Sequence, residues 1–190
     1  MLEKLRLAKG RGRDLAEYID LLKNVDAAME KLNRLHGPQM KCAPGCDECC
    51  RAPRSALLIE GFFMSIALRQ KLDESRLNEL LERADADPET CPFLNSEGLC
   101  VIYEARPVIC RTHGAPLLLD TGDEVGVSFC RLNFTARDRN EPFEQDDVID
   151  TIDINRRLAE LNGRFSAGGF PSDARISFPD ILRAAVCNNA

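Results

Sequence analysis

The sequence contains no tryptophan and only two histidines in 190 residues. It has no apolar run of the roughly 18 residues that a membrane-spanning helix needs, so we expect no membrane partner. The N-terminal stretch MLEKLRLAKGRGRDL lacks the apolar region of a secretory signal, which predicts a cytoplasmic protein. Basic residues are outnumbered by acidic ones, 25 to 31, and a net charge of −6 argues against a nucleic-acid partner. No Ser/His/Asp set, phosphate-binding loop or dinucleotide-binding glycine pattern occurs either.

Cysteine is abundant, with nine residues in the chain. An odd number of cysteines without an export signal fits a closed disulfide framework poorly, and a chain of this length does not need one for stability. In a reducing compartment such closely spaced thiols are typical of metal ligands. The composition therefore predicts metal binding, in preference to disulfides or inert core thiols.

The pattern of apolar residues predicts a mainly α fold with a small cysteine-rich block of hairpins and loops. We expect bound metal to hold this block together. Because the hairpins add some strand, the fold class is α+β by strict count. Asp14 and Glu17 suggest a helix N-terminus, Gly37-Pro38 a helix end and Asp73 a further N-cap. The expected helices span 14–35, 55–72, 73–84, 146–162 and 179–186. Hairpins are expected around 95–98 and between 115–119 and 125–129.

The expected domain organisation is simple. Residues 1–13 carry five basic and one acidic residue and predict a basic N-terminal arm. Residues 14–190 are expected to form a single domain, in which 42–130 is the metal-binding region and 146–190 a helical C-terminal extension.

The first group of cysteines is Cys42-x3-Cys46-x2-Cys49-Cys50. Its short spacings lower the entropy lost in bringing the thiolates together, and soft thiolates select zinc, copper(I) or iron–sulfur over hard cations. Neighbouring side chains diverge in both strands and helices, so Cys49 and Cys50 are more easily placed toward two centres than toward one. The spacing therefore predicts that this group can bind a metal cluster. Radical S-adenosylmethionine enzymes hold their cluster with the same spacing, but too few residues follow it here for the barrel that such an enzyme needs.

The second group of cysteines is too widely spaced to bind a metal from one short loop. Its members are Cys91, Cys100, Cys110 and Cys130. These four reach the first group only if the fold brings the hairpin and its flanks back to it. His113 is a possible replacement for one thiolate, and Cys187 is expected to be a free thiol. The arginines nearest to the cysteines either offset the charge of a thiolate centre or form ordinary surface ion pairs; they are Arg51, Arg106 and Arg111.

The segment CAPGCDECC with Arg51, followed by CPFLNSEGLCVIYEARPVICR and the later Cys130, resembles the YkgJ-like CxxCxxCC family. These are bacterial proteins described as zinc- or iron-chelating. The likeness covers 42–130, with one departure, since three residues rather than two separate Cys42 from Cys46. The resemblance implies metal binding by eight cysteines, namely Cys42, Cys46, Cys49, Cys50, Cys91, Cys100, Cys110 and Cys130. A relative, flagellin lysine N-methylase, carries a similar cluster, which offers methyl transfer as an analogy.

We therefore expect a metal-binding protein that holds zinc or an iron–sulfur cluster and has no assignable reaction. Two alternatives stay open: an enzyme that uses an open iron–sulfur site in methyl or electron transfer, and a metal-handling protein that gives its ion to a client. The residues name no client and no oligomeric state. A closed four-thiolate site would favour a metal that only stabilises the fold, and an open metal position would favour an enzyme.

Overall fold

The structure, a computed structural model, describes residues 12–120, 122, 124–138, 141–167 and 169–187. Its helices are α2 (Gly12–His36), α3 (Leu58–Lys71), α4 (Glu74–Ala86), α5 (Val108–Thr112), α6 (Thr151–Ser166) and α7 (Phe178–Cys187). Its strands are β1 (Ser55–Leu57), β2 (Leu117–Asp120), β3 (Val125–Ser128), β4 (Ile149–Asp150) and β5 (Arg175–Ser177). The expected mainly α fold with small β elements is confirmed.

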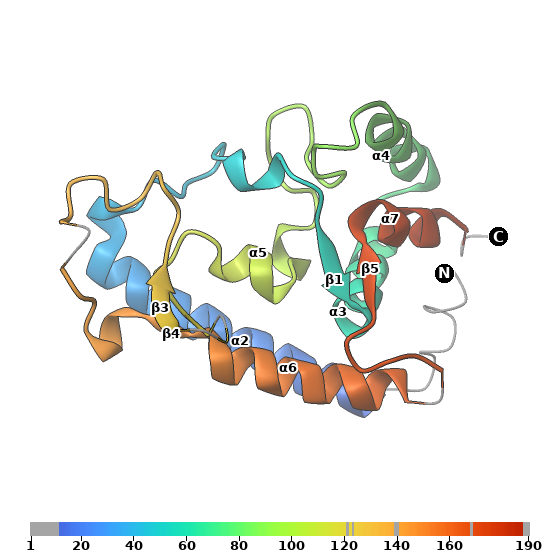
Figure 1. The fold of residues 1–190 in the computed structure, drawn as a ribbon. Coiled ribbons are helices and arrows are strands. Elements are labelled where there is room, and N and C mark those ends of the chain that lie inside the picture. The colour runs from blue at the N-terminus through green and yellow to red at the C-terminus, as the bar shows by residue number, and fades with distance from the viewer. Residues whose placement is uncertain (1–11, 121, 123, 139–140, 168, 188–190) are drawn as a thin grey trace.

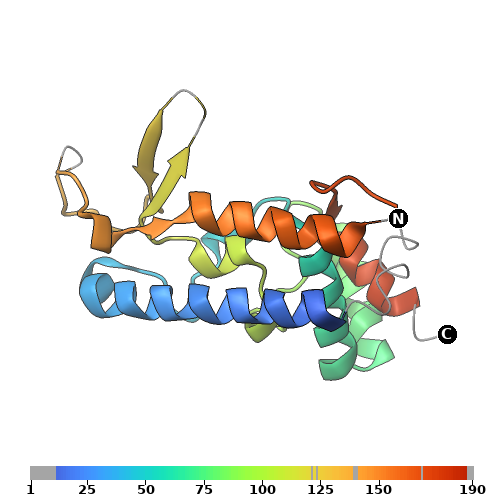
Figure 2. The same cartoon turned by 90° about the horizontal axis from the view of Figure 1, so that it is seen from below.

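The longest helices, α2 and α6, lie side by side and run in opposite directions (Figures 1 and 2). Arg164, near the end of α6, binds the carboxylates of Asp14 and Glu17 in the first turns of α2. Both helices turn apolar residues inward, because leucine and aromatic side chains recur at helical spacing along each of them. This pair forms one wall of the molecule.

The second group of helices is α3, α4 and α7, with the short antiparallel sheet β1–β5 beside them (Figure 1). Gly61 in α3 allows the close approach of this sheet and α7, since a Cβ there would lie 2.6 Å from Ile176 Cγ2 and 3.3 Å from the side chain of Ile181. The main core joins both groups of helices, and its buried residues run from Tyr18 in α2 to Ala185 in α7.

The short helix α5 lies between these two groups and contacts α2 (Figure 1). It is tied to α3 by the buried carboxylate of Glu60, which accepts hydrogen bonds from the N–H groups of Leu57 and Val108, both at 2.9 Å. After α5 the chain enters the sheet β3–β2–β4, whose β2–β3 hairpin projects away from the helices (Figure 2). The segments that carry the cysteines connect these elements.

Several predicted elements are confirmed. Helix α2 ends at His36, immediately before Gly37-Pro38, and the Asp73 side chain caps α4 by accepting a hydrogen bond from the Arg76 N–H. The hairpin predicted around residue 122 is present as β2 and β3, although Thr121 lies outside the described residues. The hairpin expected around 95–98 is reduced to a single antiparallel bridge, between Leu94 and Cys100.

Other predicted boundaries were wrong. Helix α2 begins at Gly12, so Asp14 lies in its first turn and is not its cap; the rest of the expected basic arm, residues 1–11, lies outside the described residues. The helix predicted from 55 begins at Leu58, because 55–57 pair with β5 instead. The helix predicted from 146 begins at Thr151, because Ile149 and Asp150 pair with β2 and the Asp150 side chain then caps the helix.

Candidate metal centre

All eight cysteines between residues 42 and 130 line one cavity of about 580 Å³. They reach it from segments that are far apart in sequence: the turn after α2, the loop after α4, the Leu94–Cys100 bridge, helix α5 and the loop after β3. The cavity also meets side chains of α2 and α7, through Met29 and Phe178. The fold therefore brings the two sequence groups of cysteines to one place, as their spacing required.

Four of these cysteines, here called the inner thiols, are Cys50, Cys91, Cys100 and Cys110. The thiols of Cys50 and Cys91 interact directly, and the Cys91 N–H donates to the Cys50 carbonyl at 2.7 Å. Cys100 and Cys110 are electrostatically coupled to Cys50 and to each other. Cys91, Cys100 and Cys110 also pack against the main core. The inner thiols are therefore half-buried and anchored by the body of the protein.

Three further cysteines, here called the outer thiols, are Cys42, Cys46 and Cys130. Cys42 is coupled electrostatically to the other two, and both Cys42 and Cys46 are exposed. Cys49 lies between the two sets, since its thiol interacts with Cys50 and is also coupled to Cys42 and Cys110. The spatial sets thus differ from the order in sequence, because Cys50 joins the second group and Cys130 joins the first.

Among the outer thiols, that of Cys42 is held in place by Asn133, a buried residue that sequence reasoning missed. Its Nδ2 donates to the Cys42 Sγ at 3.4 Å and to the Gly114 carbonyl at 2.7 Å, while its Oδ1 accepts from the Lys41 N–H at 2.7 Å. Gly114 has φ +99°, and a Cβ on it would lie 2.5 Å from the Cys42 Sγ. The only sequence signal for either residue was its position three or four residues after a cysteine.

The pKa of five of these thiols is raised, which favours their protonated form. Burial, assisted by Cys50 and Cys100, raises the pKa of Cys110 to about 12. The hydrogen bond with Cys49 lowers the pKa of Cys50, but the interaction with Cys91 and burial outweigh it and raise that pKa to about 11. Burial also raises the pKa of Cys42 and of Cys100. A metal ion reverses this preference, because it binds the thiolate and displaces the proton.

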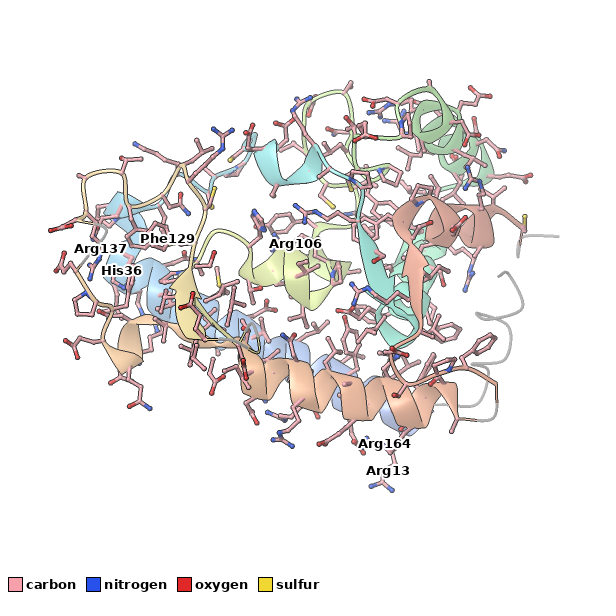
Figure 3. All side chains as sticks on the ribbon, viewed as in Figure 1. Arg13, His36, Arg106, Phe129, Arg137 and Arg164 are labelled. Carbon is pink, nitrogen blue, oxygen red and sulfur yellow. The ribbon has the colours of Figure 1, made fainter. Side chains whose placement is uncertain are left out.

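Three arginines line the cavity and place positive charge beside the thiols. Arg111, which is 8% exposed, binds both carboxylate oxygens of Asp26 at 2.7 and 2.6 Å. Arg106, beside α5 in Figure 3, donates to the carbonyls of Tyr103 and Cys110 and stacks on the Tyr103 ring. Arg54, which the sequence analysis did not single out, donates from Nε and Nη2 to the Cys49 carbonyl. Within the described residues, neither Arg54 nor Arg106 forms an ion pair with a carboxylate.

The remaining candidates have different surroundings. His113 lines the cavity, and burial together with Arg54 lowers its pKa, which favours the neutral imidazole that metals bind. Arg51 points elsewhere and pairs with Asp47 on the surface at 2.6 Å. Cys187 is exposed at the end of α7, remote from the cavity lining. None of the nine cysteines is in a disulfide.

Comparison with known families matches residues 41–134 to the family described as "CxxCxxCC: Putative zinc- or iron-chelating domain". The match covers just under half of the chain. The resemblance seen in the sequence is thereby confirmed, and the matched region contains every cysteine of the cavity. Neither the curated proteins nor the solved structures contain a match to the chain.

The residues of the CxxCxxCC domain fit a chelated metal by their chemistry, since eight soft thiols surround one cavity. In the described part of the chain, no three His, Cys, Asp or Glu side chains are already arranged to hold an ion. No helix among the described residues is long and apolar enough to cross a bilayer.

Proposed function

We propose that this chain is a cytoplasmic metal-chelating protein that holds zinc or iron at two neighbouring centres. Its proposed ligands are Cys42, Cys46, Cys49, Cys50, Cys91, Cys100, Cys110 and Cys130. The observation that carries this proposal is the shared cavity, because eight unpaired thiols from five segments have no other common role in the fold. His113 lines the same cavity and is proposed as a replacement for one of these thiolates.

The charges around the cavity support this proposal. A zinc ion bound by four thiolates carries two negative charges, which need compensation in a half-buried site. Arg54 and Arg106 provide unpaired guanidinium groups next to the inner thiols, and both are held in place by backbone carbonyls. Their loss is expected to weaken metal binding without changing the ligand set.

We propose zinc as the metal of protein isolated in air, because zinc has no redox chemistry and resists oxygen. An iron–sulfur cluster is the alternative, since the same thiolates suit both. The two metals give the protein different colours and different contents of acid-labile sulfide.

Metal analysis of the full chain, purified without oxygen, tests this function. The wild-type chain is expected to carry zinc, or iron with sulfide, and Cys50→Ser and Cys110→Ser each to lower the content by about one centre. Cys187→Ser is the matched control and should leave the content unchanged, because Cys187 is exposed and remote from the cavity. A wild-type chain that binds neither metal, or that loses as much metal with Cys187→Ser as with Cys110→Ser, would overturn the proposal.

A second candidate function is an enzyme that uses an open iron–sulfur site for methyl or electron transfer. The observation that favours it is the cavity volume of about 580 Å³, which leaves room for a small molecule beside the thiols. Protein that is brown, contains stoichiometric iron and sulfide, and changes its electron paramagnetic resonance spectrum when a small molecule binds would support this candidate over simple chelation.

A further inference from the structure

The inner and outer thiols differ in how firmly the fold holds them. Cys91, Cys100 and Cys110 pack against the main core, and their backbones are tied by the Cys91–Cys50 hydrogen bond, the Cys100–Leu94 bridge and the Arg106 contact to Cys110. None of the outer thiols belongs to either hydrophobic cluster of the described residues. A ligand can leave a metal only where the chain that carries it can move, so this difference predicts two rates of exchange.

The outer thiols also differ among themselves. Asn133 and Gly114 fix the Cys42 Sγ, and Gly114 lies against Cys130 as well, since a Cβ on it would be 3.9 Å from the Cys130 Cβ. Cys46 is exposed on the turn Ala43–Cys46, and no other described residue forms a hydrogen bond to its thiol. Cys46 is therefore the ligand that an incoming molecule reaches first.

We propose that the outer thiols hold an exchangeable metal ion and pass it to external thiol ligands, with Cys46 as the first ligand to leave, whereas the inner thiols hold a metal ion that stabilises the fold. This inference rests on the proposed function and adds the class of acceptor, a thiol. The three outer cysteines line the cavity, which has room beside them for a ligand of small size.

The exchange step is a ligand substitution without electron transfer. The sulfur of the acceptor thiol forms a bond to the outer ion, the bond from Cys46 to that ion breaks, and the proton of the acceptor passes to the released Cys46 sulfur. The number of thiolates on the ion and its oxidation state stay the same. Cys42 and Cys130 keep the ion in place during this step because Asn133 and Gly114 restrain them.

Zinc release from the full chain tests this inference. Metal-free protein is loaded with zinc, and a coloured zinc chelator is added with and without glutathione as the thiol probe. We expect two phases of release whose rates differ at least about tenfold, which corresponds to ~1.4 kcal/mol in activation free energy. Glutathione should accelerate only the fast phase, because only the outer ion presents an accessible thiolate.

Variants assign the two phases. Cys46→Ser should remove the fast phase and its zinc while the slow phase stays. Cys187 is also exposed but does not line the cavity, so Cys187→Ser should change neither phase. Cys46 lies on an exposed turn, so this variant is expected to fold, and its circular dichroism spectrum checks this. Two bound zinc ions released in one phase, or a fast phase that persists in Cys46→Ser, would refute the inference and leave chelation intact. A chain that binds no zinc would refute the proposed function itself.

Discussion

Replacing Gly114 with alanine is predicted to remove the outer metal and leave the inner one. Gly114 adopts φ +99°, where an L-residue costs about 1–2 kcal/mol. The added Cβ would lie 2.5 Å from the Cys42 Sγ and 3.1 Å from the Asn133 Nδ2. Since ordinary contacts between such atoms need about 3.5–4.0 Å, the sulfur must move by roughly 1 Å.

A displacement of this size matters because a zinc–thiolate bond is only about 2.3 Å long. Loss of a correctly placed ligand or of the group that orients it typically lowers metal affinity by about 10–100-fold. We therefore expect the outer zinc affinity of Gly114→Ala to fall by this factor, with inner zinc affinity unchanged. Zinc titration in competition with a chelator of known affinity measures both, and denaturation with urea measures the accompanying loss of stability.

The matched control is Gly122→Ala. Gly122 also has a positive φ, +85°, but a Cβ there would meet no atom within 4 Å. This variant should therefore lose about 1–2 kcal/mol through backbone strain alone and keep both zinc ions. The reasoning is refuted if Gly114→Ala binds two zinc ions as tightly as the wild type does, or if Gly122→Ala loses the same zinc.

The remaining predictions concern thiol chemistry and packing. Thiol titration of denatured, unreduced, metal-stripped protein should count all nine cysteines as free; four pairs that react only after reduction would contradict this. The interaction with Cys91 and burial, which outweigh the lowering by Cys49, raise the pKa of Cys50 to about 11, and burial raises that of Cys110 to about 12. Both values lie above the unfolded value, so the metal-free fold should keep its full stability below about pH 9 and lose stability as the pH rises from there toward 12. Thermal melts at pH 8 to 11 check this, and bound zinc should abolish the trend; the reverse slope would show that the sign is wrong. Gly61→Ala, whose Cβ would press on Ile176, should cost about 1–3 kcal/mol in urea denaturation without changing metal content, and an unchanged midpoint would count against the packing argument.

The sequence was sufficient for elements whose signals are local. The end of α2 at Gly37-Pro38 and the Asp73 cap of α4 depend on backbone chemistry within a few residues, and both were predicted correctly. The starts of α3 and α6 were not, because residues 55–57 and 149–150 pair with strands more than 25 residues away. Such pairing competes with local helix propensity, and it cannot be recognised from the neighbouring residues in the sequence.

The candidate site shows the same division. The family resemblance implied the eight cysteines as metal ligands, and all eight line one cavity; their role as ligands stays a prediction. The division into inner and outer thiols was not foreseen, because Cys50 and Cys130 change groups only through the tertiary fold. Arg54 and Asn133 were missed for a related reason. An arginine or an asparagine near a cysteine is common, and only burial and hydrogen bonds distinguish these two from their neighbours.

The core that supports the cavity is built partly from helices outside the region that matches the family. The family match ends at residue 134, yet α3 within it is covered by α7, and α2 and α6 close the other wall. Buried side chains from outside the matched region include Tyr18, Leu158, Phe165, Ile181 and Leu182. Each contributes about 1.5–3 kcal/mol by burial, so together they contribute about 7.5–15 kcal/mol, which is comparable to the roughly 5–15 kcal/mol that stabilises a whole domain. The CxxCxxCC region of this chain is therefore not a portable module: its thiol cavity can be transplanted to another protein only together with the flanking helices.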